Sequence, residues 1–145
     1  MKAVIFDCNV YDLLAKDEVA ISVINKMIHS GSLKVLVTRT IAEELWKLPF
    51  GGVPNFFPIE YTGNTVGRCG LMQCGDNIGS GSVFDAHLGT SNQVNDALIA
   101  DAASWKAQWL VSEDARLRRR MARVSAPCRA ISYGEFKEVV ATWAE

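Results

Sequence analysis

The sequence predicts an α/β protein, specifically a three-layer α/β/α sandwich around a central parallel sheet. Short apolar runs of strand length alternate with segments of helical periodicity along most of the 145 residues. The first run, Val4 to Phe6, is apolar at consecutive positions, as in a strand covered on both faces. Alternation of strands and helices favours right-handed crossovers, which make neighbouring strands parallel.

Length and composition set the broad class. The 145 residues fit one domain spanning 1–145, and 15 basic against 16 acidic residues leave a formal charge of -1. There is thus no global attraction to nucleic acid, and any basic surface must be local. No apolar run approaches the ~20 residues of a membrane span. Four cysteines without a signal peptide ahead of them favour a reduced, cytoplasmic protein.

Capping and breaking residues delimit the elements of the first half. Asp17 is a good N-cap, Gly31 is a typical helix stop, and Pro49 cannot continue a helix. The expected elements are the first strand, a helical turn over 10–14, a helix over 17–30, a strand over 33–38 and a helix over 39–48.

Regular patterns are interrupted by an irregular, Gly-rich insertion at about 49–90. Long loops of this kind are usually functional, and the apolar pieces 56–61 and 82–84 are candidates for short strands or plugs. Cys69 and Cys74 are close in sequence, as pairs of zinc ligands are, but no second close pair completes the four ligands of a zinc site. Two ordinary loop thiols are the favoured interpretation. After the insertion we expect a helix over 92–108, a strand over 109–112, an arginine-rich helix, a strand over 129–132 and a helix over 133–144.

Acidic residues follow two of the predicted strands. Asp7 ends the first strand, and Asp114 comes just after the strand over 109–112. Because ligands of open parallel sheets bind beyond the carboxyl ends of the strands, both carboxylates are candidates for a site there. The alternative for Asp7 is a purely structural role as the cap of the helix that follows it.

A third acid lies on an apolar helical stripe. Glu44 shares the stripe of Ile41 and Leu45, whereas Glu43 is displaced toward solvent. A carboxylate on a buried stripe must be paired, protonated or bound to metal. A salt bridge to Arg39 is the structural alternative.

The fourth acid is on the helix after the insertion. Asp96 falls on one stripe with Ile99, Ala100 and Ala103, and it is expected to point inward. Asp101 is five positions further, about 140° around the helix, and is expected to be solvated.

Four acids from separate segments would repel one another at one edge of a sheet. Hard divalent cations such as Mg²⁺ or Mn²⁺ prefer oxygen ligands and would compensate the charge. These cations also promote phosphodiester hydrolysis, since they lower the pKa of bound water and stabilise the leaving oxygen.

In these motifs the sequence resembles the PIN-domain nucleases. The matching stretches are Val-Ile-Phe-Asp7-Cys-Asn9, Glu44-Leu45, Asp96-Ala-Leu-Ile-Ala-Asp-Ala and Leu-Val-Ser112-Glu-Asp114. The resemblance implies that the catalytic, metal-binding carboxylates are Asp7, Glu44, Asp96 and Asp114, positioned by Asn9 and Ser112. Cys8 departs from the usual threonine or serine, and the insertion has no counterpart that we can name.

The same resemblance implies a Mg²⁺- or Mn²⁺-dependent endoribonuclease, of the kind that in bacteria often acts as a toxin controlled by an antitoxin protein and commonly forms homodimers. The chain has one dense basic patch, for which the alternative is a solvated helix face. We expect it to contact RNA phosphates or an acidic partner through Arg116, Arg119, Arg120 and Arg123.

Two other functions remain open from the sequence. Ile-Phe-Asp7-Cys-Asn9 is also similar to the nucleophile motif of haloacid-dehalogenase-type phosphatases, although these normally have a second acid where Asn9 stands. A catalytically idle PIN fold that binds RNA or protein is the other alternative, and divalent-metal binding discriminates between it and a nuclease.

Overall fold

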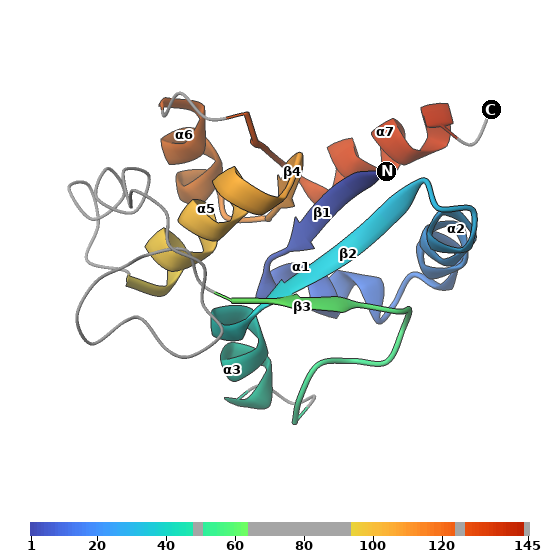
Figure 1. Ribbon diagram of the computed structural model, residues 1–145, viewed down its shortest axis with the longest axis horizontal. Coiled ribbons are helices and arrows are strands. Elements are labelled where there is room, and N and C mark those ends of the chain that lie inside the picture. Colours follow the sequence, from blue (N-terminus) through green and yellow to red (C-terminus); the bar gives the residue numbers. More distant parts are fainter. Residues whose placement is uncertain (48–50, 64–93, 124–126, 144–145) are drawn as a thin grey trace.

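A central sheet of five parallel strands organises the structure, a computed structural model that describes residues 1–47, 51–63, 94–123 and 127–143, with side chains in the third range from Ala97 onward. The strands lie in the order β3-β2-β1-β4-β5 (Figure 1). Their bounds are β1 Lys2–Phe6, β2 Leu33–Thr38, β3 Glu60–Thr62, β4 Trp109–Val111 and β5 Arg129–Ile131. The predicted α/β class and the parallel sheet are confirmed.

The first strand is the centre of this sheet. Val4 pairs with Val35 of β2 on one side and with Trp109 of β4 on the other. All of β1 after Lys2 is buried, and Val4, Ile5 and Phe6 have no exposed surface. The consecutive apolar residues therefore reflect a strand that is covered on both faces.

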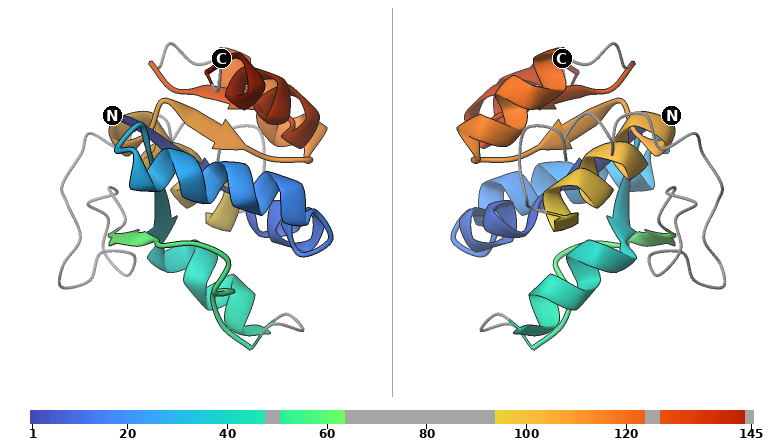
Figure 2. Two further views of the ribbon diagram at one scale, coloured as in Figure 1. Left: turned by 90° about the vertical axis from the view of Figure 1, so that its right-hand side faces the viewer. Right: turned by 90° about the vertical axis from the view of Figure 1, so that its left-hand side faces the viewer.

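Helices connect the strands and cover the sheet. They are α1 Cys8–Leu14, α2 Glu18–His29, α3 Arg39–Lys47, α5 Val94–Lys106, α6 Ala115–Arg123 and α7 Tyr133–Trp143. In the views of Figure 2, α2 and α7 lie together on one side of the molecule, and α5 and α6 lie together on the opposite side. Within the described ranges, no helix has the length and apolar character that crossing a bilayer requires.

Helix α2 begins and ends at the capping and stop residues that the sequence predicts. The Asp17 side chain accepts a hydrogen bond from Ala20 N at 3.0 Å. Beyond the helix, Gly31 adopts φ 75°, a left-handed conformation that glycine takes without a Cβ clash. Helix α1 differs from the prediction, because it begins at Cys8 rather than Val10 and has Asp7 as its N-cap.

Part of the predicted insertion belongs to the regular fold. Residues 60–62 form β3, which pairs in parallel with β2 at the edge of the sheet. Just before it, Phe57 is only 5% exposed and packs against Phe6. The stretch 56–61 thus contributes both a buried plug and the start of a strand, while the candidate piece 82–84, Cys69 and Cys74 lie outside the described residues.

Aromatic rings from four segments meet on one face of β1. The Phe6 ring lies 5.2 Å from that of Phe136 on α7, 6.0 Å from Phe57 and 6.2 Å from Tyr11 on α1, centroid to centroid. Rings at these separations and tilted orientations attract one another beyond the gain from burying their area. This cluster joins β1, α1, the segment before β3 and α7 into one core.

Replacing Phe136 with alanine should therefore destabilise the whole fold. Phe136 is 1% exposed, and deleting such a ring removes buried area and leaves a cavity. We expect Phe136→Ala to lower the free energy of unfolding by about 3–5 kcal/mol, measured by urea denaturation. Trp46 is a control of similar size because it is 70% exposed; for Trp46→Ala we expect about 0.5 kcal/mol. Equal losses in the two variants would contradict this account of the core.

Candidate metal site at the carboxyl edge of the sheet

The strand order reverses direction between β1 and β4. From β1 the chain builds outward through β2 to β3, then returns to place β4 on the other side of β1. The strand ends are linked by hydrogen bonds from Asp7 N to Val111 O, 2.9 Å, and from Ser112 N to Ile131 O, 3.0 Å. In open parallel sheets such a switch point is the usual place for a ligand site.

Asp7 lies at this point with little access to solvent. Its side chain is part of a residue only 7% exposed, and Oδ2 accepts a hydrogen bond from Ser112 Oγ at 2.8 Å. Its Oδ1 accepts from Cys8 N at 2.8 Å, so Asp7 also caps α1. The structural role considered from the sequence is therefore real, and it coexists with a place in the acidic cluster.

The pKa of the Asp7 carboxyl is raised above its ordinary value. Burial is the largest cause, and the negative charges of Glu44 and Asp114 add to it. The hydrogen bonds from Ser112 and from Cys8 N oppose this effect and favour the ionised form. A cation placed at this carboxylate would remove much of the cost of its charge.

Glu44 reaches the same place from α3. Cys8 Sγ donates to Glu44 Oε2 at 2.9 Å, and one ligand atom from each of Asp7, Cys8 and Glu44 lies within 4.8 Å of the others. The neighbouring Glu43 has a side chain 61% exposed, with Oε1 at 3.9 Å from Arg39 Nε. The helical stripe correctly separated the two glutamates, because Glu44 faces the cluster and Glu43 faces solvent.

Asp114 closes the other side of the switch point. Asp114 N donates to Ser112 Oγ at 3.1 Å, so this hydroxyl links Asp114 to Asp7. Asp114 Oδ1 accepts from Arg116 N at 2.9 Å and thereby caps α6. Its negative charge is a minor cause of the raised pKa of Asp7, after burial and Glu44, and its own side chain caps α6.

The prediction for Asp101 is wrong. Asp101 has no exposed surface, and every residue from 97 to 103 is buried. Helix α5 packs against α3, α6, β1 and β4, so its stretch 97–103 is enclosed on every side and the 140° displacement does not bring Asp101 to solvent. The side chains become exposed one turn later, at Trp105. Asp96 belongs to the first turn of α5, but its side chain lies outside the described residues; its inward orientation stays a prediction.

The two predicted positioning residues both act on the loop after β4. Ser112 bridges the acids as described, and Asn9 Oδ1 accepts from Glu113 N at 3.3 Å. Sequence analysis missed Arg118, whose Nη1 donates to Ser112 O at 2.7 Å. Its position three residues after Ala115, off the common arginine face, gave no signal of this contact.

The predicted arginine-rich helix is α6, and the contact of its arginines with RNA or a partner stays a prediction. Leu117 and Met121 turn inward and are buried, while the partly or fully exposed arginines form the outer surface of α6. These residues are Arg116, Arg119, Arg120 and Arg123. Among the residues that the structure describes, none of the four takes part in an ion pair.

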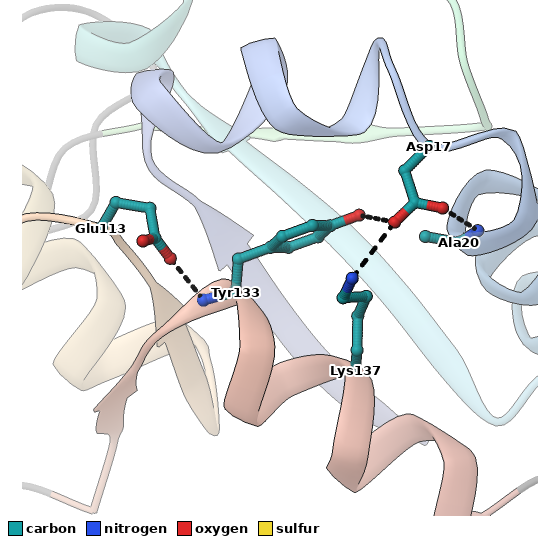
Figure 3. Close-up of polar contacts among 5 residues, drawn as sticks. All are labelled: Asp17, Ala20, Glu113, Tyr133 and Lys137. Atoms are coloured by element: carbon teal, nitrogen blue, oxygen red, sulfur yellow. Dashed lines mark hydrogen bonds and ion pairs between the residues drawn. The ribbon is translucent and has the colours of Figure 1, made fainter.

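Glu113, the residue between the two site residues of this loop, is tied to α7 (Figure 3). Its Oε1 accepts from Tyr133 N at 2.8 Å, and Tyr133 Oη donates to Asp17 Oδ2 at 2.9 Å. Lys137 Nζ lies 3.4 Å from the same carboxylate oxygen. The loop that carries Ser112 and Asp114 is thus held by contacts that extend to the start of α2.

The fold and this geometry define a class: a parallel α/β protein with a partly buried acidic cluster at its switch point. Comparisons with protein-family models, with curated proteins and with solved structures gave no match. The similarity to PIN-domain nucleases therefore rests on the motifs alone.

The raised pKa of Asp7 predicts how stability depends on pH. A carboxyl with a folded-state pKa above its unfolded value of about 3.9 holds its proton more tightly when folded, so its contribution to stability falls as pH rises through that window. Asp7→Asn removes the group whose ionisation lowers stability, and the asparagine side chain can still hydrogen-bond to Ser112. We expect it to raise the free energy of unfolding at pH 7, without metal, by about 0.5–2 kcal/mol.

Asp17→Asn is the matched control, because the sign is opposite. Hydrogen bonds from Ala20 N and Tyr133, together with Lys137, lower the pKa of Asp17. Its contribution is therefore present above about pH 3.9 and is lost as pH falls through the lowered pKa, so Asp17→Asn should destabilise at pH 7. Urea unfolding from pH 3 to 8 measures both effects. Destabilisation by Asp7→Asn at pH 7 would mean that the Asp7 charge is well compensated.

Proposed function

We propose that this protein is a metal-dependent ribonuclease that hydrolyses RNA phosphodiester bonds with Mg²⁺ or Mn²⁺. The observation that carries the proposal is the meeting of Asp7 and Glu44 at the switch point, with Asp114 close enough for its charge to raise the Asp7 pKa. Buried like charges at a ligand-binding edge are costly unless a cation joins them.

The residues present suit a hard divalent cation. Carboxylate oxygens from β1 and α3 have ligand atoms within 4.8 Å of one another, a separation that one ion can span. Asp7 and Glu44 would hold the ion, and Asp114 would add negative charge nearby. When bound, such an ion supplies an activated water and stabilises charge on the leaving oxygen.

Neighbouring residues of the chain orient the carboxylates of the site. Ser112 fixes one oxygen of Asp7 and the start of the loop that leads to Asp114, and Arg118 anchors the main chain of Ser112. Neither of these contacts needs a bound ligand, so the carboxylates are held in place before a substrate arrives. Preorganisation of this kind avoids reorganisation during the reaction.

An anionic substrate is favoured by the outer face of α6. That helix begins directly after Asp114, and its exposed arginines lie on the surface next to the loop that carries the site acids. RNA brings a phosphate at each nucleotide, which lets several arginines contribute at once. A cleft for a small substrate would not need four such residues. The PIN-like motifs favour RNA over other phosphodiesters.

The carboxylates should be needed for hydrolysis but not for folding. We expect Asp7→Asn, Glu44→Gln and Asp114→Asn each to reduce RNA cleavage in Mg²⁺ or Mn²⁺ by about a hundredfold or more. Asparagine preserves the helix caps that Asp7 and Asp114 provide, so these changes remove charge rather than the helix ends. Cleavage of a fluorescent RNA measures the rate, and circular dichroism checks the fold.

Glu43→Gln is the control for Glu44→Gln, since the two residues are adjacent on α3 and differ only in facing solvent or the cluster. Glu43→Gln should leave the rate within about twofold, as surface substitutions usually do. Equal effects of the two changes, or full activity of Asp7→Asn, would contradict a catalytic site at the switch point.

The arginine surface should contribute salt-dependent binding. Each phosphate neutralised adds nearly one unit to the slope of log affinity against log salt, so Arg119→Ala with Arg120→Ala should reduce that slope by about one to two units. The measurement uses the Asp7→Asn protein, which binds RNA without cutting it. Arg129→Ala is the control, because Arg129 is exposed at the opposite, amino end of a strand. An unchanged slope in the double variant would leave the patch without a role in RNA binding.

A further inference from the structure

A thiol lies inside the candidate metal site. Cys8 is 7% exposed, and its Sγ is 2.9 Å from Glu44 Oε2. It is also within 4.8 Å of a carboxylate oxygen of Asp7, so the sulfur belongs to the same group of candidate ligand atoms as the two acids. A metal ion held by Asp7 and Glu44 would therefore meet this sulfur.

A second buried polar group lies beside the same thiol. Tyr11, one turn further along α1, has no exposed surface, and its hydroxyl has no hydrogen-bond partner among the described residues. Cys8 and Tyr11 are three positions apart on α1, so their side chains leave the same side of the helix. Buried hydroxyls are nearly always hydrogen-bonded. This one is available to a water or other ligand of an ion bound at Cys8.

We propose that Cys8 is a third ligand of this site and that it lets Zn²⁺ compete there with Mg²⁺ or Mn²⁺. The inference rests on the proposed function, because it concerns the same site. Thiolate sulfur is a preferred ligand of Zn²⁺, whereas Mg²⁺ and Mn²⁺ favour oxygen. Two carboxylates and one thiolate provide three protein ligands, and the fourth position of a tetrahedral ion is left for water.

The proton balance follows from the Cys8–Glu44 hydrogen bond. Without a metal ion the sulfur carries its proton and donates a hydrogen bond to Glu44 Oε2. When Zn²⁺ binds, the S–H bond breaks, the proton leaves to solvent, and the sulfur lone pair forms the bond to the metal. Glu44 Oε2 then loses this hydrogen bond from Cys8 and can bind the same ion.

The test compares the full chain with its Cys8→Ser variant. Serine keeps a donor for Glu44 but is a poor ligand for Zn²⁺. We expect the Zn²⁺ affinity, measured by competition with a chromophoric chelator, to fall at least about tenfold. The Mn²⁺ affinity, measured by equilibrium dialysis, should stay within about twofold, because manganese relies on the oxygens. Co²⁺ bound to the unmodified chain should give a near-ultraviolet thiolate charge-transfer band, and Cys8→Ser should abolish it.

Two controls separate this thiol from the others. Cys128→Ser changes another buried thiol, 3% exposed, just before β5 and should leave Zn²⁺ affinity and the cobalt band unchanged. The pair Cys69→Ser and Cys74→Ser tests the loop thiols. Loss of the band in that pair, or equal Zn²⁺ affinity in Cys8→Ser and the unmodified chain, would overturn the inference.

Manganese binding distinguishes this failure from that of the proposed function. Suppose that Mn²⁺ binds, that its binding requires Asp7, and that it supports RNA cleavage. If the Zn²⁺ affinity is nevertheless the same in Cys8→Ser and the unmodified chain, only the thiol inference fails. If Asp7→Asn changes the binding of neither ion, both proposals fail.

Discussion

The hydrogen bond from Ser112 to Asp7 is the interaction on which the candidate site depends. It joins the ends of β1 and β4, residues 105 positions apart in the sequence, at the point where the strand order reverses. The same hydroxyl accepts from Asp114 N, so one buried serine fixes two carboxyl-bearing residues. Without such a donor, burial would make the ionised form of Asp7 still more costly, because its hydrogen bonds are what oppose the effect of desolvation.

Structural and functional roles overlap in these acids. Asp7 caps α1 and Asp114 caps α6, and each does so from the carboxyl end of a strand. A short loop that ends a strand and starts a helix must satisfy free backbone N–H groups, and an aspartate does this while its charge remains near the sheet edge. The caps hold each carboxylate at the start of a helix.

The loop after β4 is held from several directions. Asn9 binds Glu113 N, Arg118 binds Ser112 O, and Glu113 binds the first amide of α7. Through Tyr133 these contacts continue to Asp17 at the start of α2. Helices on one side of the molecule are therefore connected to the site by hydrogen bonds as well as by the aromatic core around Phe6. Such support is what a site requires if its charges are to keep their separation.

The sequence alone determined what local chemistry controls: the central buried strand, the cap at Asp17, the left-handed Gly31, and the opposite orientations of Glu43 and Glu44. Periodicity and capping act over a few residues, so they are visible without a fold. Only the tertiary structure decided that Asp101 is buried, that 60–62 adds an edge strand, and that the thiol of Cys8 meets Glu44. These depend on which elements pack together. The middle of a helix that packs against four neighbours is buried on every side, and its sequence pattern cannot reveal how many neighbours it has.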